Sequence, residues 1–351
     1  MFVDEPRMQT RTKGAALGAV QVEWDEDALA YQLSAYRLMY VLKNVFSGSE
    51  WLLTGSAAIS TYLKPRERRM HTGFDIALPA PIMARCLRDQ DGLERDINFR
   101  LRELGYSSQL DFGGFPFEIG IVDKIRNLAS GKARFVSVFK GGYMTLKNAA
   151  RSCPRLSSKM ALLNNANAFN SFRLTPFFVE FKPWSEDPMD TNQWLVHHSN
   201  AVELDYQNAG STASGLPPIK LLVSSLDVLV ASKLNMIYQS AVNERLVRAT
   251  PLSSHHASKA GRPKVHAADV YDYCLSSRLV LPSTVRKILT KMLTEPVNAF
   301  LDTTAEALRK ISATKSFEEL NLLLPSSAQL DQKSWKDICE ESVSHIKKVR
   351  E

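Results

Sequence analysis

The spacing of apolar and polar positions divides the chain into a first part that mixes helices with strands and a last part that is mostly helical. Residues 25–46 and 82–104 carry apolar side chains at the spacing of amphipathic helices. A short apolar run at 51–53 and an alternating run at 74–78 predict strands, and the small residues of 57–63 predict a short helix between them. This order predicts a mixed α/β fold.

Alternating patterns continue beyond this first group. Residues 175–182 and 200–206 predict strands with one apolar face, and residues 106–147 predict short strands and hairpins. The Ser/Asn-rich stretch 150–172 predicts a loop or insertion. The Gly/Ser/Pro cluster at 208–218 is the most linker-like segment of the chain, which places a domain boundary there.

Three parts follow from this boundary. We expect a loose N-terminal arm at 1–22, an α/β domain with a mixed sheet and flanking helices at 23–215, and a helical C-terminal domain at 216–351. In the last part, residues 283–351 predict about three amphipathic helices, with a connector near 324–329.

A lysine interrupts the apolar stripe of the first C-terminal helix, predicted at 225–240. Lys233 lies within that stripe, so its ammonium must either extend to solvent or meet a buried anion. After a polar and basic segment at 243–263, expected to be a loop, VHAADVYDYCL predicts a second helix. On this helix Asp269 and Asp272 are three residues apart and share a face.

Composition narrows the class of protein. The net charge is +7 and the sequence pI about 9.1, which suits a polyanion such as nucleic acid or nucleotide, or simply gives a solvated basic surface. The four cysteines lie far apart without paired metal-ligand spacing, which predicts reduced thiols and argues against a disulfide scaffold or a zinc site. No apolar run approaches the roughly 18 residues of a membrane span, and no signal peptide is apparent, so we expect a cytoplasmic protein without a membrane partner.

The stretch WLLTGSAAISTYLKPRERRMHTGFDIAL, residues 51–78, carries the candidate chemistry. Gly55 allows a ligand close to the backbone, Ser56 can cap the following helix, and free amides at such a helix start bind phosphate oxygens. On the next strand Asp75 shares its face with Ala77. A phosphate cradle facing a carboxylate is the outline of a nucleotide site.

This outline resembles the opening motif of the polymerase-beta-like nucleotidyltransferases, in which Gly-Ser is followed by Asp-x-(Asp/Glu) on the next strand. LTGSAAISTYL…R…TGFDIAL is most similar to the AbiEii branch, known from bacterial abortive-infection and toxin–antitoxin systems. LDVLVASKLNMI followed by ADVYDYCL is similar to the family pattern of a helix with a lysine and a next helix with Asp-x-x-Asp. The resemblance spans roughly residues 50–280 and departs from the family at Ala77, where the second acid belongs.

The resemblance implies a role for each residue. Asp75, Lys233 and Asp269 would be catalytic, with Lys233 on nucleotide phosphate and Asp272 in support. Asp75 would also bind the metal, and Glu180 either stands where the third carboxylate belongs or pairs with a neighbouring cation. The further candidates for binding nucleotide are Gly55, Ser56 and Arg69. Arg69 belongs to a basic run that includes Arg66 and Arg68, and such a run otherwise forms a solvated face.

Three functions stay open. The first is transfer of a nucleoside monophosphate from an NTP, with Mg²⁺ or Mn²⁺, to an RNA such as a tRNA end or to a protein, in a toxin with an antitoxin partner. The second is a catalytically degenerate relative, a pseudoenzyme that binds nucleotide or nucleic acid. The third is an unrelated α/β interaction protein in which the motif occurs by chance.

Overall fold

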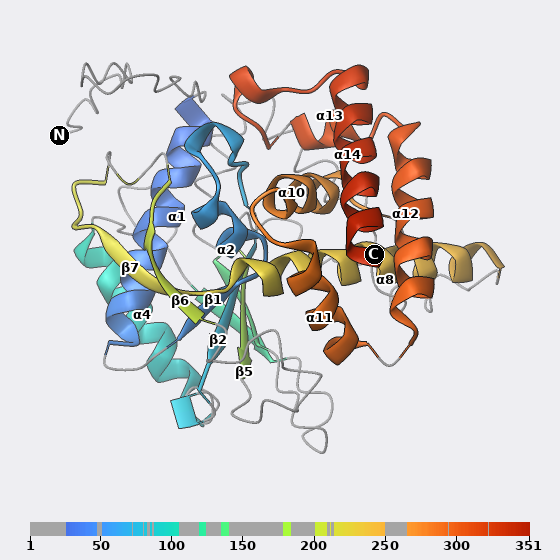
Figure 1. Cartoon of the computed structure of the whole chain (residues 1–351). Helices are drawn as coiled ribbons and strands as arrows, with labels where there is room; N and C mark the ends of the chain where they lie inside the picture. The colour runs from blue at the N-terminus through green and yellow to red at the C-terminus, as the bar shows by residue number, and fades with distance from the viewer. Residues whose placement is uncertain are drawn as a thin grey trace.

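The computed structural model describes residues 26–47, 51–104, 201–249 and 265–351, each of the last three with short gaps, and three strands between 119 and 183. The expected arm at 1–22 and insertion at 150–172 lie outside the described residues. Figure 1 shows the strands beside a group of C-terminal helices.

A seven-stranded mixed sheet forms the centre of the first part, in the order β3-β4-β5-β2-β1-β7-β6. Its middle strands are β1 (Leu52–Thr54) and β2 (Gly73–Leu78), which run antiparallel. β1 is parallel to β7 (Ile219–Ser224), and β2 is parallel to β5 (Phe178–Pro183). The outer strands are β3 (Ile119–Asp123), β4 (Phe135–Phe139) and β6 (Ala201–Tyr206). The expected mixed α/β fold is confirmed.

Among the residues that the structure describes, the sheet is accompanied by helices α1 (Glu26–Val45), α2 (Gly55–Tyr62) and α4 (Gln90–Glu103). Helices α1 and α4 lie side by side, and their apolar residues share a core with Phe74 and Ile76 of β2. Ala77 has the opposite orientation and packs with Leu52 in a separate small cluster. The alternation expected for this strand is therefore confirmed, because Phe74 and Ile76 lie on one face and Ala77 on the other.

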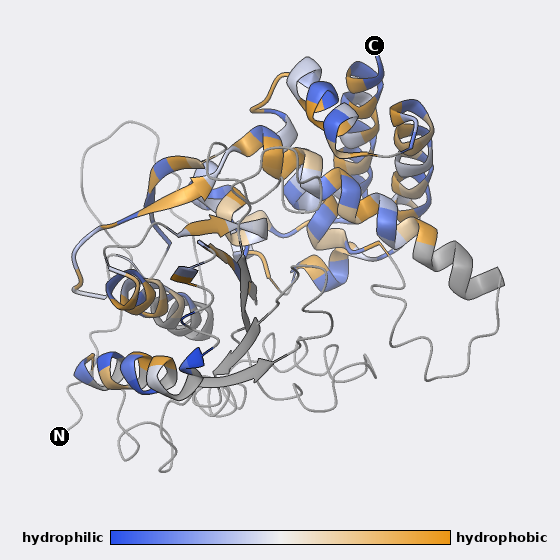
Figure 2. Ribbon diagram, turned by 90° about the horizontal axis from the view of Figure 1, so that it is seen from below, coloured by the Kyte–Doolittle hydropathy of each residue, from blue (hydrophilic) through white to orange (hydrophobic). Residues whose placement is uncertain are grey.

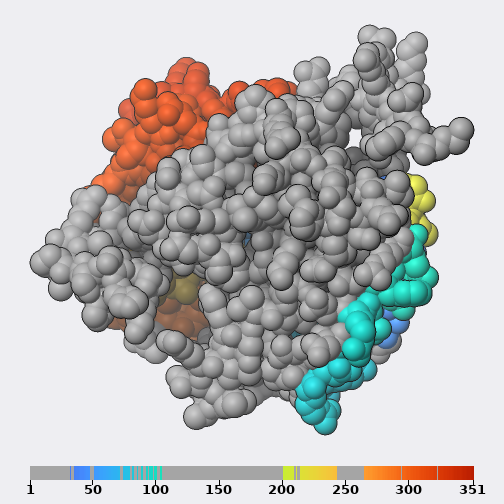
Figure 3. All heavy atoms as spheres, turned by 180° about the vertical axis from the view of Figure 1, so that it is seen from behind, coloured from blue at the N-terminus to red at the C-terminus, as the bar shows by residue number. Residues whose placement is uncertain are grey.

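Helix α8 (Leu226–Ala249) runs from the sheet into the helical part, which contains α10 (Ala267–Ser277), α11 (Pro282–Met292), α12 (Val297–Ser312), α13 (Phe317–Asn321) and α14 (Gln332–Arg350). Figure 2 shows these helices striped with hydrophobic and hydrophilic residues, as amphipathic packing requires. Fully buried Trp335 anchors α14, and its indole N–H donates to the Ile311 carbonyl at 3.1 Å. From behind, α4 and the C-terminal helices lie on opposite sides (Figure 3).

The sheet continues past the boundary expected at residue 215. Strand β7 belongs to it, with Ile219, Leu221 and Val223 buried on one face. In the sequence, the two prolines before this strand are typical of a linker. The alternating pattern of the strand is short and directly precedes the pattern of a helix, so it does not stand out as a strand. The segment from residue 243 was expected to be a loop, yet α8 continues to Ala249. The expected connector near 324–329 is confirmed, and it contains a short 3-10 turn at Ser326–Ala328.

None of the helices that the structure describes is both long and apolar enough to cross a membrane.

Candidate functional site

The strand carboxylate and the start of α2 lie against each other. Gly55 begins α2 directly after β1, and the register pairs Thr54 of β1 with Asp75 of β2. Gly55 has φ +70°, a conformation that favours glycine, and a Cβ atom added there would overlap the Asp75 carboxylate. The close approach expected at Gly55 is therefore made by the protein's own acid.

Ser56 does not cap α2, contrary to the expectation from sequence. The N-cap is Thr54, which makes no side-chain capping bond, and Ser56 is already the second helical residue. Its hydroxyl oxygen instead accepts a hydrogen bond from Lys233. The first amides of a helix have no partner within the helix, and Gly55 and Ser56 lie at this position and are partly buried.

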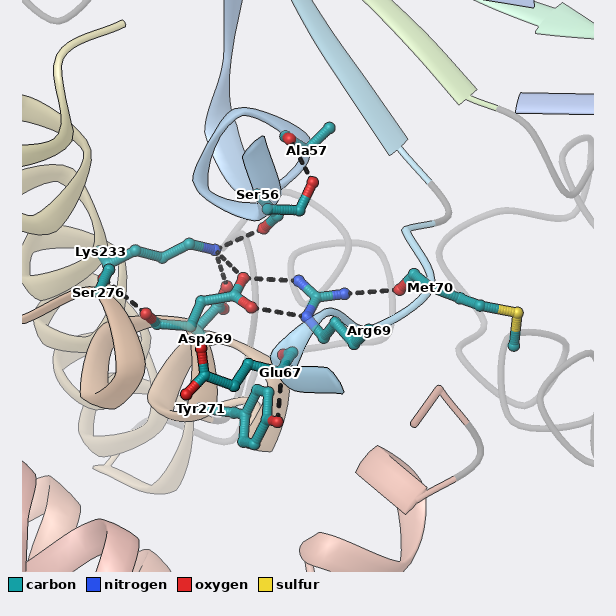
Figure 4. A network of polar contacts seen from close by, with 11 residues as sticks. Ser56, Ala57, Glu67, Arg69, Met70, Lys233, Asp269, Tyr271 and Ser276 are labelled. Atoms are coloured by element: carbon teal, nitrogen blue, oxygen red, sulfur yellow. Dashed lines mark hydrogen bonds and ion pairs between the residues drawn. The ribbon is translucent and has the colours of Figure 1, made fainter. Parts of the chain in front are cut away.

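Lys233 reaches this turn from α8 and is only 1% exposed. Its Nζ donates to Ser56 Oγ at 2.6 Å and to Asp269 Oδ1 at 2.7 Å, and it lies 3.2 Å from Asp272 Oδ2 (Figure 4). An ammonium group has three N–H donors, and two of them donate to Ser56 and Asp269, while Asp272 is an ion-pair partner. Of the two outcomes expected for a lysine in the apolar stripe, the structure has the second, a buried anion.

Asp272 joins this group to Arg69. The Arg69 guanidinium donates from Nε to Asp272 Oδ1 at 2.8 Å and from Nη2 to Oδ2 at 2.7 Å, and its Nη1 donates to the Met70 carbonyl at 3.0 Å. Burial would raise the pKa of Asp272, but Arg69 and Lys233 outweigh it and hold that pKa well below its ordinary value. Two cations and two carboxylates therefore balance in charge within a buried network.

A histidine that sequence reasoning did not select lies close to the same charges. Burial lowers the pKa of His71 well below its ordinary value, and the positive charges of Arg69 and Lys233 lower it further against the opposing effect of Asp272. The imidazole is therefore neutral near pH 7. Its position two residues after Arg69 was the only signal in the sequence.

Residues 64–71, here called the strap, connect α2 to β2 and are held at several points. Arg68 donates to the Leu63 and Gln207 carbonyls, and exposed Arg66 has no place in the network of Figure 4. From the helical part, the Tyr271 hydroxyl donates to the Glu67 carbonyl at 3.2 Å. The Met70 amide donates to the Leu323 carbonyl at 2.8 Å. The helical part thus fixes the segment that leads into the strand of Asp75.

The carboxylates suit a hard cation only in part. Among the side chains that the structure describes, no three His, Cys, Asp or Glu residues gather closely enough to hold a metal ion. Asp75 supplies one carboxylate, and the register places Glu180 of β5 directly beside it, although the Glu180 side chain lies outside the described residues. Since Mg²⁺ is commonly bound by one or two carboxylates together with substrate phosphates, this donor set fits a metal that arrives with a nucleotide.

Of the candidate residues, Ser56, Arg69, Lys233, Asp269 and Asp272 therefore form one network, and Asp75 lies at its edge through Gly55.

Comparison with known proteins identifies no family for the chain. No family model matches it, and no curated protein matches it. Two solved structures from Helicobacter pylori are similar over most of the chain. One is JHP933, 11% identical, covering 93% of this chain and 94% of its own, with a TM-score of 0.40. The other, described as a candidate nucleotidyltransferase, is 9% identical, covers 93% and 98%, and has a TM-score of 0.40. Similarity at this level determines neither the family nor the activity of the chain.

Proposed function

We propose that this protein is a nucleotidyltransferase that binds the phosphates of an NTP between the start of α2 and Lys233. One observation carries the proposal. A buried ammonium from α8 meets the Gly55-Ser56 turn, with Nζ 2.6 Å from Ser56 Oγ, while Asp75 of the neighbouring strand lies on Gly55. A helix start, a cation and a carboxylate from three segments thus meet in one place, which supports a site for phosphate.

Each group has a task in transferring a nucleoside monophosphate. The amides at the start of α2 and the Lys233 ammonium would stabilise the charge that develops on the leaving pyrophosphate. Asp269, 2.7 Å from Nζ, would hold that ammonium in position. Asp75, with Glu180 in register beside it, would hold Mg²⁺ or Mn²⁺. The metal would supply Lewis-acid stabilisation of the charge on the triphosphate.

For the acceptor we propose an RNA, such as a tRNA end, before a protein. The net charge of +7 supports this choice because a basic protein attracts a polyanion at long range. The resemblance to the AbiEii branch supports a toxin with an antitoxin partner as the biological setting.

The environment of Ala77 favours a second candidate, a protein that binds nucleotide without turnover. Ala77 is fully buried and packs with Leu52, so β2 offers no second carboxylate beside Asp75. A metal held by one carboxylate fewer is positioned less firmly, and binding would then be the whole function.

Two measurements on the same preparations test the proposal. Calorimetry measures the binding of each NTP, and label transfer with Mg²⁺ or Mn²⁺ to RNA and protein acceptors measures turnover. We expect Asp75→Asn to abolish transfer, while the exposed strand residue Asp205 provides the matched control Asp205→Asn, which keeps it. Binding without transfer on any acceptor supports the second candidate. Absence of both binding and transfer refutes the two together.

A further inference from the structure

We propose that Arg69 and Asp272 form a positioning pair that keeps the Lys233 ammonium on Ser56, and that Arg69 does not touch phosphate itself. The proposal rests on the nucleotidyltransferase function above and deepens it. It replaces the direct nucleotide contact that the basic run of the sequence led us to expect for Arg69.

The geometry at Asp272 is the first reason. Arg69 donates to both of its carboxylate oxygens, at 2.8 and 2.7 Å, whereas Lys233 lies 3.2 Å from Oδ2 and 2.7 Å from Asp269. A two-pronged guanidinium–carboxylate pair is strong and fixed in direction. Held in this way, Asp272 presents a fixed oxygen to Lys233 and so fixes the position of the ammonium; without the pair the ammonium would be free to leave Ser56.

The burial of Arg69 is the second reason. Its side chain is 8% exposed, and Nε, Nη1 and Nη2 all donate to Asp272 or to the Met70 carbonyl. If the guanidinium turned to a phosphate, Asp272 would keep only Lys233 as a cationic partner in a buried site, which is costly. If Arg69 instead acts on Lys233 through Asp272, all the bonds of the buried network are kept.

The strap connects the pair of Arg69 and Asp272 to the strand of Asp75. Asp272 and Tyr271 are neighbours on α10, and both bind the strap, through Arg69 and through the Glu67 carbonyl. The strap leads directly into β2 and Asp75. One helix of the C-terminal part thus holds both the lysine and the approach to the strand acid, which gives that part of the chain a role in the site.

The test replaces the pair by apolar residues in the double variant Arg69→Met/Asp272→Leu. This change leaves the net charge unaltered, and a well-packed apolar pair commonly restores the stability that a buried ion pair gives. We expect the unfolding temperature to stay close to that of the wild type, while the calorimetric Kd for ATP rises by about 10- to 100-fold, the loss of one charge-assisted phosphate bond. On a Lys233→Ala background the same replacement should change Kd no further, because the pair acts through Lys233.

Arg278 and Glu341 provide the matched control. They form another two-pronged pair, between α10 and α14, but are 43% and 44% exposed. Arg278→Met/Glu341→Leu should leave the Kd for ATP unchanged. If the apolar replacement of Arg69 and Asp272 does not fold, Arg69→Lys, which keeps the charge and loses the fork, is measured instead with the same expected direction.

The outcomes separate the two proposals. If wild type binds ATP through Lys233 and the variants of Arg69 and Asp272 bind it equally well, the positioning role is overturned and the proposed function stands. If wild type binds no nucleotide, or Lys233→Ala binds like wild type, the proposed function is overturned and the positioning role with it.

Discussion

Replacing Gly55 by alanine measures how tightly the strand carboxylate is held against the start of α2. Gly55 has φ +70°, and a residue with a Cβ atom in that conformation costs about 1–2 kcal/mol. The added methyl group would also overlap the Asp75 carboxylate, and overpacking of this kind costs a further ~1–3 kcal/mol. We therefore expect Gly55→Ala to lower the free energy of unfolding by about 2–5 kcal/mol.

Gly215 provides the control for the backbone contribution. Its φ is +65°, nearly that of Gly55, but a Cβ atom added there would have no neighbour within 4 Å. Gly215→Ala should therefore cost only the backbone part, about 1–2 kcal/mol. The difference between the two variants isolates the displacement of Asp75.

Urea unfolding of a double-mutant cycle checks this reasoning. Asp75→Ala removes the carboxylate that the new methyl group would meet, so Gly55→Ala should cost less on that background, with a coupling of about 1–3 kcal/mol. The argument is refuted if the two glycine variants lose the same stability within about 0.5 kcal/mol and the cycle shows no coupling.

Three further predictions concern the network and the helical part. Lys233→Met leaves Asp269 and Asp272 short of a cation and should cost about 3–5 kcal/mol in urea unfolding, whereas Lys310→Met, at a side chain 67% exposed, should cost less than about 1 kcal/mol. Burial lowers the pKa of His345 to about 4. Its neutral imidazole therefore contributes to the free energy of unfolding in full above the unfolded pKa of about 6.5, and this contribution is lost as pH falls toward 4. The free energy of unfolding, measured against pH, should fall by about 3 kcal/mol across this window, and His345→Gln should not show this fall. Arg286 donates to the Val349 and Arg350 carbonyls at the end of α14, so Arg286→Met should lower the unfolding free energy by about 1 kcal/mol, and an unchanged value would contradict that role.

The parts of the site that sequence could predict depend on local periodicity. Three residues along a helix bring Asp269 and Asp272 to one face, and the periodicity of α8 places Lys233 within an apolar stripe. Both follow from helix geometry alone, and the choice that this leaves for Lys233, extension to solvent or a buried anion, follows from the cost of burying a charge. The alternation around Asp75 is predictable in the same way, from the pleat of a strand.

The parts that sequence could not predict depend on partners far along the chain. Arg69 and Asp272 are 203 residues apart, so nothing near Arg69 distinguishes a buried ion pair from a solvated basic run. Strand β7 is identified by its pairing with β1, which no local pattern reports. The hydroxyl of Ser56 was expected to cap its own helix because capping is a local rule, yet the distant Lys233 uses it.

The donors of Lys233 constrain how a nucleotide could enter this site. Nζ donates to Ser56 and Asp269 and lies 3.2 Å from Asp272, and the lysine is only 1% exposed, so a phosphate oxygen reaches the ammonium most readily by replacing one of these neighbours. Two of these neighbours are buried carboxylates, whose charge-assisted interactions are stronger than a bond to a neutral hydroxyl and costly to separate in a buried site. The Ser56 hydroxyl is the only neutral acceptor of the three, and it lies at the start of α2, where the helix amides attract an anion. Exchange of Ser56 Oγ for a phosphate oxygen is therefore the least costly route, and it preserves the pairing of Lys233 with Asp269 and of Asp272 with Arg69.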